Sequence, residues 1–172
     1  MKDKIISNLI QLEKIISTLR QKKKTIVLTQ GSFDMAHIGH GRYLQAAKEM
    51  GNTLIVGVDS DAKIRHRKGP DRPVVPQEER LEMLTYLSSV DYVILKDLDR
   101  PKWELIKAVK PDILVATKET YNAQQIKDLK EFCGQVIVLD PKATTSTSAK
   151  IRRIQLNIVS KIEILLEELK NA

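Results

Sequence analysis

The chain has 172 residues, 42% of them apolar and 30% charged, a composition typical of one folded globular domain. Its formal net charge of +7 favours anionic ligands, but aromatic residues make up only 4%, too few for the stacking surfaces of single-stranded nucleic-acid binding. No apolar run approaches the roughly 18 residues of a membrane span. We therefore expect neither nucleic acid nor a membrane as a partner.

The single cysteine, Cys133, excludes an intramolecular disulfide and a zinc site built from several cysteines. We interpret it as a plain thiol in a reducing compartment. Charges at Lys2, Asp3 and Lys4 interrupt the N-terminus, which lacks the apolar core of a secretory signal. These features predict a cytoplasmic protein.

Apolar residues from Ile5 to Leu19 recur with helical spacing and predict an amphipathic helix over about residues 3–21. Five short runs rich in β-branched residues then predict buried strands, at residues 25–29, 53–58, 91–95, 112–116 and 135–139. Helical patterns lie between the strands, at residues 40–50, 76–87, 101–109 and 123–132. This alternation indicates a doubly wound, Rossmann-like α/β fold with a five-stranded parallel sheet.

A last helical pattern runs from Ser148 to the C-terminus, with Ile and Leu recurring every three or four residues. We expect a single domain in which an extra N-terminal helix (1–22) and a C-terminal helix (148–172) are added to the α/β core (25–147). The apolar stripes of the two terminal helices exceed what a five-stranded core can cover. They therefore predict a homodimer or a larger assembly.

The segment 31–40, which reads G-S-F-D-M-A-H-I-G-H, connects the first core strand to the next helix. His37 and His40 are three residues apart in a first helical turn, so both rings lie on one face within reach of one phosphate. The N-terminus of a helix attracts phosphate, and Gly31 and Gly39 leave room for a nucleotide to approach the backbone. A metal half-site is the alternative, although no adjacent Glu of the HExxH kind supports it.

This segment resembles the signature of the HxGH, or cytidylyltransferase-like, nucleotidyltransferase superfamily. Further stretches resemble motifs of the same family, at residues 58–61 (V-D-S-D), 68–74 (K-G-P-D-R-P-V), 78–84 (E-E-R-L-E-M-L), 90–93 (V-D-Y-V) and 146–154 (S-T-S-A-K-I-R-R-I). They are most similar to the adenylyltransferase half of bacterial ADP-heptose synthases and less so to glycerol-3-phosphate cytidylyltransferases. Class I aminoacyl-tRNA synthetases share the tetrapeptide H-I-G-H but need a far longer chain.

The resemblance implies an enzyme that transfers a nucleotidyl group from a nucleoside triphosphate (NTP), most closely ATP, to a small phosphorylated acceptor such as heptose 1-phosphate. Pyrophosphate is released, and Mg²⁺ accompanies the NTP. The implied catalytic residues are His37, His40 and Lys68. The implied nucleotide-binding residues are Gly31, Ser32, Phe33, Asp34, Gly39, Asp59, Arg72, Arg80, Ser146, Thr147 and Ser148.

The residues themselves leave alternatives open for the basic positions. Lys68 lies on a basic, mobile segment over residues 63–72, where it can reach a phosphate or remain a solvated charge. Arg72 follows in a D-R-P turn. Arg80 can reach the phosphates or form a surface ion pair with a neighbouring Glu on its helix.

The acidic and hydroxyl positions are similarly open. Asp34 is either structural or helps to place a divalent ion, so the metal ligands stay unassigned. Asp59 and Asp61 follow the second core strand and contact a ribose or an acceptor, or else cap the next helix. Of the three hydroxyl residues at 146–148, one caps the last helix and the others offer hydroxyls and amides to a phosphate.

One segment departs from the relatives. Where they have a Gly- and Asp-containing turn after the fourth core strand, residues 116–121 read A-T-K-E-T-Y and introduce Lys118. This leaves open a cytidylyltransferase for glycerol 3-phosphate or another polyol phosphate, and an FMN adenylyltransferase. A nucleotide-binding regulatory module without turnover is the alternative from a different functional class.

Overall fold

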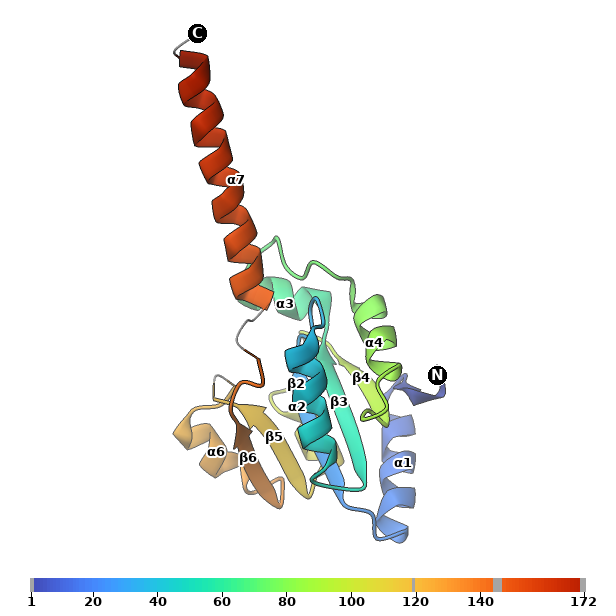
Figure 1. Ribbon diagram of the computed structural model, residues 1–172. Coiled ribbons are helices and arrows are strands. Elements are labelled where there is room, and N and C mark those ends of the chain that lie inside the picture. Colours follow the sequence, from blue (N-terminus) through green and yellow to red (C-terminus); the bar gives the residue numbers. More distant parts are fainter. Residues whose placement is uncertain (1, 119, 144–146, 171–172) are drawn as a thin grey trace.

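In the computed structural model, which describes residues 2–118, 120–143 and 147–170, the chain folds around a parallel sheet of six strands (Figure 1). Their order is β1-β4-β3-β2-β5-β6, and every neighbouring pair is parallel. Runs of Val, Ile and Leu form the central strands because both faces of the sheet are covered. The strands are β1 (Ile5–Ile6), β2 (Ile26–Gly31), β3 (Thr53–Asp59), β4 (Tyr92–Lys96), β5 (Ile113–Thr117) and β6 (Gln135–Leu139).

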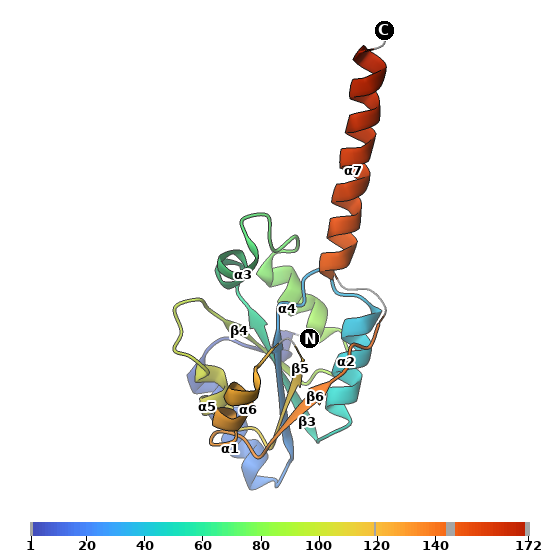
Figure 2. The same cartoon turned by 90° about the vertical axis from the view of Figure 1, so that its left-hand side faces the viewer.

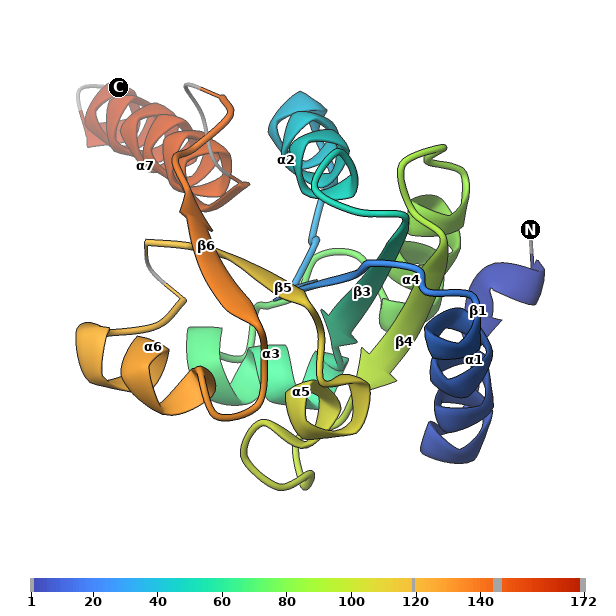
Figure 3. The same ribbon diagram turned by 90° about the horizontal axis from the view of Figure 1, so that it is seen from below.

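Helices connect the strands and cover the sheet on both sides, as Figure 3 shows. Leu12, Leu105 and Leu129, from α1, α5 and α6, belong to the buried cluster on one face. Leu44 and Leu84, from α2 and α4, belong to the cluster on the other. This confirms the doubly wound α/β prediction. The helices are α1 (Leu9–Gln21), α2 (Ile38–Lys48), α3 (Asp61–Lys68), α4 (Gln77–Thr85), α5 (Glu104–Val109), α6 (Ala123–Leu129) and α7 (Thr147–Lys170).

The N-terminal segment differs from the single helix predicted over residues 3–21. A 3-10 turn (Lys2–Lys4) leads into β1, whose Ile5 and Ile6 pair with β4 and add the sixth strand. The helix begins only at Leu9, because the Asn8 side chain accepts a hydrogen bond from the Gln11 amide and caps it. The apolar stripe of α1 packs on the core of its own chain, so this helix is not free to pair subunits.

The basic segment is also more ordered than expected. Residues up to Lys68 form α3, which Ser60 caps by accepting a hydrogen bond from the Lys63 amide at 3.3 Å. Gly69, with φ of +95°, ends the helix in a conformation that favours glycine. Lys68 therefore lies at the end of a helix instead of on a mobile loop.

Helix α7 projects from the body of the molecule (Figures 1 and 2). Every residue from 152 to 170 is exposed, including large apolar side chains such as Ile158 and Leu165. In the described part of the chain, no helix combines the length and apolar character needed to cross a membrane.

Candidate active site

A cavity of about 1190 Å³ opens at the carboxyl ends of the strands. Gln30 and Gly31 of β2, Asp59 of β3, Lys96 of β4 and Thr117 of β5 contribute to its wall. The loop after β2 and the start of α7 complete it. This is the edge of an open parallel sheet at which ligands bind, because the connecting loops diverge there.

The two predicted histidines lie together in this cavity. His37 is the N-cap of α2, and its Nδ1 accepts a hydrogen bond from the Gly39 amide at 3.1 Å. His40 Nδ1 accepts in turn from the His37 amide at 3.3 Å. The pair thus forms a capping box from imidazoles, with ring centroids 4.2 Å apart.

These hydrogen bonds decide what each ring presents to a ligand. Because Nδ1 is an acceptor in both rings, the proton of the neutral imidazole resides on Nε2. Burial lowers the pKa of His37, and nearby Lys150 lowers it further. Burial, His37 and Lys68 lower the pKa of His40 to about 4. At neutral pH the site therefore holds two neutral imidazoles, each with an Nε2–H donor available.

The two glycines of the motif make room for protein atoms. A Cβ on Gly39 would lie 2.8 Å from the Ala143 Cβ and 2.8 Å from His37 Cε1, too close for either to remain in place. A Cβ on Gly31 would lie 3.1 Å from the Phe33 ring. Gly39 thus lets Ala143 pack against the histidine loop. Both glycines also line the cavity, and their role in admitting a nucleotide stays a prediction.

Basic side chains dominate the cavity wall and make it suited to phosphate groups. Acidic side chains there are fewer: Asp34, Asp59, Glu104 and Asp140. The basic ones are Lys63, Arg67, Lys68, Arg72, Lys96, Arg100, Lys102, Lys118 and Lys142.

Lys68 lines this cavity, and the residue as a whole is exposed. No hydrogen bond or ion pair of its amine occurs among the described residues. Partial burial and the guanidinium groups of Arg67 and Arg72 lower its pKa. The group is therefore available to an anionic ligand, as the sequence predicts.

Asp34 is a structural residue. Its carboxylate accepts hydrogen bonds from the Val74 and Val75 amides, at 3.1 and 3.0 Å, and pairs with the Arg72 guanidinium at 2.6 Å. Burial opposes its ionisation, but these partners outweigh it and lower the pKa. The carboxylate thus fastens the loop after β2 to the segment before α4. Arg72, its partner, also lines the cavity, and a contact with the nucleotide stays a prediction.

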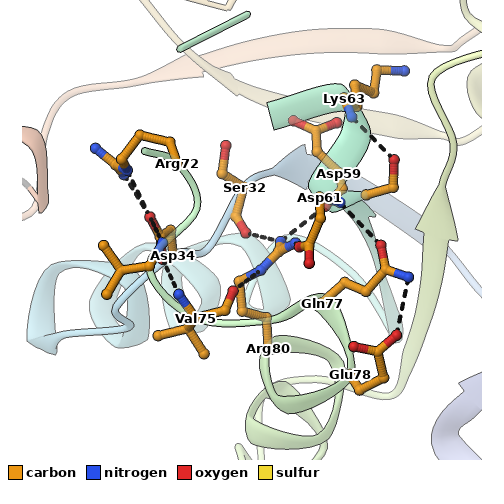
Figure 4. A network of polar contacts seen from close by, with 12 residues as sticks. Ser32, Asp34, Asp59, Asp61, Lys63, Arg72, Val75, Gln77, Glu78 and Arg80 are labelled. Atoms are coloured by element: carbon orange, nitrogen blue, oxygen red, sulfur yellow. Dashed lines mark hydrogen bonds and ion pairs between the residues drawn. The ribbon is translucent and has the colours of Figure 1, made fainter. Parts of the chain in front are cut away.

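Arg80 is also structural, in contrast to both roles expected for it. The residue is 2% exposed and is not among the described residues that line the cavity. Its guanidinium donates to the carbonyls of Ser32, Asp59 and Val75 and pairs with Asp61 at 2.7 Å (Figure 4). It therefore joins the loop after β2, the end of β3 and the segment before α4, and contacts protein oxygens in place of phosphates.

Asp59 ends β3 and lies almost fully buried beneath two cations. The Arg67 guanidinium is 3.0 Å from one carboxylate oxygen, and the Lys96 amine is 3.2 Å from the other. Arg67 also donates to the Ser32 hydroxyl at 2.8 Å. The sequence analysis assigned no role to Arg67 or Lys96. The signal was available for Lys96, because it ends β4 and the ends of parallel strands meet at one edge.

The start of α7 is tied to the histidine loop. The Thr147 hydroxyl donates to the Asp34 carbonyl at 2.8 Å and is buried, so it holds the histidine loop. Thr147 also lines the cavity, and its contact with a phosphate stays a prediction. Ser148 is exposed at the cavity wall, where its hydroxyl can meet a ligand. Ser146 lies outside the described residues.

The altered loop after β5 contributes Lys118 to the cavity mouth. Its amine pairs with Asp140 at 2.7 Å, and both side chains are more than 70% exposed. Such a pair stabilises the fold little and exchanges readily for a ligand. Lys118 therefore lies at the cavity wall, as its position after the fourth predicted core strand indicates. Its role in selecting substrates stays a prediction.

No group of three or more His, Cys, Asp or Glu that could hold a metal occurs in the described ranges. Asp34 uses its oxygens on protein donors. The donor set of the described residues does not fit a resident metal held by protein side chains alone.

Comparison with known proteins decides the family. A family model described as cytidylyltransferase-like matches residues 28–162, which contain the whole loop after β2 and the start of α7. The chain belongs to this family. The resemblance seen in the motifs is thereby confirmed.

The curated relatives of this chain include proteins named bifunctional protein HldE. The protein of a Nitratiruptor species is 41% identical over 153 residues, covering 89% of this chain and 32% of the relative. That of a Helicobacter pylori strain is 42% identical over 147 residues, covering 86% and 31%. The chain thus spans about a third of the length of these relatives.

Solved structures share the cytidylyltransferase-like fold. A lipopolysaccharide core biosynthesis protein from Thermoplasma volcanium has a TM-score of 0.62 and 25% identity, over 69% of this chain and 98% of its own. A pantoate-beta-alanine ligase from Francisella tularensis has a TM-score of 0.59 over 78% of this chain and 66% of its own. At 18% identity, the second match shows the fold alone.

Proposed function

We propose that this chain transfers a nucleotidyl group from an NTP, preferably ATP, to the phosphate of a small sugar phosphate and releases pyrophosphate. The observation that carries the proposal is the pair of neutral imidazoles, each offering an Nε2–H donor, in a cationic cavity at the end of β2. Membership of the cytidylyltransferase-like family supports the reaction class. The similarity to a protein of lipopolysaccharide core biosynthesis supports a sugar acceptor.

The reaction is an in-line displacement. An oxygen of the acceptor phosphate forms a bond to the α-phosphorus, and the bond from that phosphorus to the oxygen bridging to the β-phosphorus breaks. Pyrophosphate leaves with the electron pair. The attacking oxygen is already anionic, so no residue has to remove a proton. Catalysis then depends on positioning and on stabilising the charge that develops in the transition state.

The residues divide this task by position. The Nε2–H groups of His37 and His40 donate to oxygens of the α-phosphoryl group. The neutral rings keep this donor because Nδ1 of each accepts a backbone amide and the proton lies on Nε2. Lys68 and the start of α7 at Ser148 stabilise the departing pyrophosphate. Mg²⁺, bound to the triphosphate, screens its negative charge.

A panel assay tests this proposal. Pyrophosphate release is measured with each of the four common NTPs against sugar, polyol and flavin phosphates. We expect ATP with a sugar 1-phosphate to be the best combination. Preference for CTP with a polyol phosphate, or for ATP with FMN, would identify the alternative members of the class. NTP binding without pyrophosphate release from any combination would show a regulatory module instead.

We further propose that α7 pairs two copies of the chain. Its residues Ile154, Ile158, Ile162, Leu165 and Leu169 recur every three or four positions and are each at least half exposed. Pairing with the same stripe of a second copy removes this surface from water.

We also propose a cytoplasmic location, because a reducing compartment fits the buried free thiol of Cys133.

A further inference from the structure

A second group of polar side chains lies in the cavity on β2, β3 and β4, apart from the histidine pair. Gln30 on β2 is in register with Gly57 on β3, and Asp59 on β3 is in register with Lys96 on β4. The side chains of Gln30, Asp59 and Lys96 therefore come from the last two residues of neighbouring parallel strands. They line the cavity together with Arg67 of α3.

Gly57 allows these side chains to meet. A Cβ at this position would lie 2.8 Å from Lys96 Cδ and 3.2 Å from Gln30 Cγ. The aliphatic part of Lys96 and the side chain of Gln30 thus both lie against the bare backbone of β3. Both residues also line the cavity.

The charges of this group do not balance. The single carboxylate of Asp59, with a side chain 3% exposed, contacts both the Arg67 guanidinium and the Lys96 ammonium. Two cations around one buried anion leave an excess positive charge. The Lys96 side chain is itself only 18% exposed, so this charge is not simply solvated. An anionic ligand would complete the neutralisation.

Gln30 provides an independent sign of a ligand. Its side-chain nitrogen is buried and has no hydrogen-bond partner among the described residues. A buried amide donor without a partner is unfavourable, and native proteins rarely retain one without a reason. Because Gln30 lines the cavity, a rotation of its side-chain amide would bring this donor to an oxygen of a bound ligand.

The place of this group in the sheet relates it to the reaction. The histidine loop follows β2, in the middle of the order β4-β3-β2-β5-β6. Arg67 and Lys96 lie on the β3 and β4 side, whereas Lys118 follows β5 and Ser148 begins α7 after β6. Cationic or donor groups thus flank the histidines on two sides. In an in-line displacement the attacking and leaving groups lie on opposite sides of the α-phosphorus, so the acceptor phosphate and the pyrophosphate need separate sets of groups. Lys68 follows Arg67 at the end of α3 but does not pair with Asp59, and it stays assigned to the triphosphate.

We propose that Gln30, Arg67 and Lys96, arranged around the buried Asp59, bind the phosphate of the acceptor. The inference rests on the proposed function and specifies its acceptor as a phosphate monoester, whose dianion matches two cations and a neutral donor. Asp59 is a positioning residue that holds the two cations in place. Arg67 and Lys96 lower the charge repulsion between the acceptor phosphate and the triphosphate.

Titration calorimetry with inorganic phosphate as the probe tests this site without turnover. Phosphate is titrated into the full chain alone and after saturation with α,β-methylene-ATP, an unreactive analogue that fills the nucleotide side. We expect Lys96→Met to weaken phosphate binding about 10- to 100-fold, as for a lost charge-assisted hydrogen bond. Affinity for the analogue should change less than about threefold. Lys127→Met, on the exposed face of α6, is the matched control and should leave both affinities unchanged.

Two further variants separate a binding role from a structural one. Lys96→Arg keeps the charge and should retain most of the phosphate affinity. Gln30→Met removes the unpartnered donor, so phosphate binding should weaken while the thermal midpoint stays the same or rises. Equal phosphate binding by Lys96→Met and the unmodified chain, or no phosphate binding by either, would overturn the site. Failure of the proposed function is a different result, because it concerns pyrophosphate release by the unmodified chain.

Discussion

Individual side chains in the loop after β2 combine structural and chemical tasks. His37 and His40 cap α2 through Nδ1, which leaves both Nε2–H groups for a ligand. Asp34 and Arg80, by contrast, satisfy their charges within the protein and hold the loop in place. The histidines are therefore positioned by a buried polar framework whose charges are paired within the protein.

The lowered pKa of His40 makes a prediction about acid stability. Its pKa is about 4 in the folded chain and near 6.5 unfolded, so the unfolded chain binds the extra proton between these values. The neutral state of His40 therefore contributes to the free energy of unfolding above pH 6.5, and this contribution is lost as the pH falls towards 4. A Gln side chain keeps an acceptor for the His37 amide but does not titrate. The free energy of unfolding should therefore fall less between pH 7.5 and 5 in His40→Gln than in the unmodified chain, by about 1 to 2 kcal/mol.

Urea unfolding at the two pH values measures this difference. His66→Gln, at an exposed position of α3, is the control and should lose as much stability as the unmodified chain. An equal loss in His40→Gln would mean that His40 is not held neutral by its surroundings.

Arg80 makes a prediction about folding. Arg80→Ala leaves the Asp61 carboxylate and several buried carbonyls without their donor, and should lower the free energy of unfolding by about 3 kcal/mol or more. Arg65→Ala, on the exposed side of α3, should change it by less than about 0.5 kcal/mol. Denaturant titration compares the two, and similar values would show that the buried network contributes little.

At the scale of elements, the sequence predicts those parts of the fold that have a hydrophobic pattern. The core strands are continuous apolar runs, and α2, α4, α5 and α6 lie close to their predicted positions. Strand β1 was missed because its two isoleucines also fit the helical spacing that continues into α1. Helix α3 was missed because Ile64 is its only buried residue, so it has no apolar periodicity.

The site was predictable where a motif is local and not where partners are distant. The histidines are three residues apart, so their proximity follows from helix geometry. The partners of Arg80, however, include Ser32, which is 48 residues away, and Asp59, which is 21 residues away. Only the fold brings these groups together, and burial then decides that the guanidinium contacts protein instead of phosphate.

The junction between α7 and the histidine loop supplies a prediction at this scale. Thr147→Val removes the hydrogen bond from its hydroxyl to the Asp34 carbonyl while keeping the shape of the side chain. We expect affinity for α,β-methylene-ATP to fall about 3- to 10-fold, the effect of one lost neutral hydrogen bond. Ser160→Ala, farther along α7, is the control. If calorimetry gives equal affinities for both variants, the start of α7 does not shape the nucleotide side of the cavity.

At the scale of the whole molecule, the apolar side chains of α7 stand out because no other part of the described chain buries them. The sequence analysis predicted that both terminal helices pair subunits, but α1 packs on its own sheet and only α7 retains an exposed apolar stripe. Pairing through α7 would leave the cavity in each copy intact, because the stripe lies beyond the residues that line it.

Light scattering tests the pairing of α7. At micromolar concentration the unmodified chain should have about twice its mass of 19.5 kDa. The double variant Ile158→Asp, Leu165→Asp places charges in the stripe and should have the mass of one chain, with unchanged affinity for α,β-methylene-ATP. A monomeric mass for the unmodified chain would contradict the proposed dimer.

The central claim is that two neutral histidines stabilise the transition state of nucleotidyl transfer. The most direct measurement is the rate of pyrophosphate release from ATP and the best sugar phosphate, in the unmodified chain and in His37→Ala and His40→Ala. We predict that each variant stays folded, by circular dichroism, and that its turnover falls about 10²- to 10⁴-fold, or roughly 3 to 5 kcal/mol. Near-normal turnover in either variant, or release of orthophosphate instead of pyrophosphate by the unmodified chain, would contradict the claim.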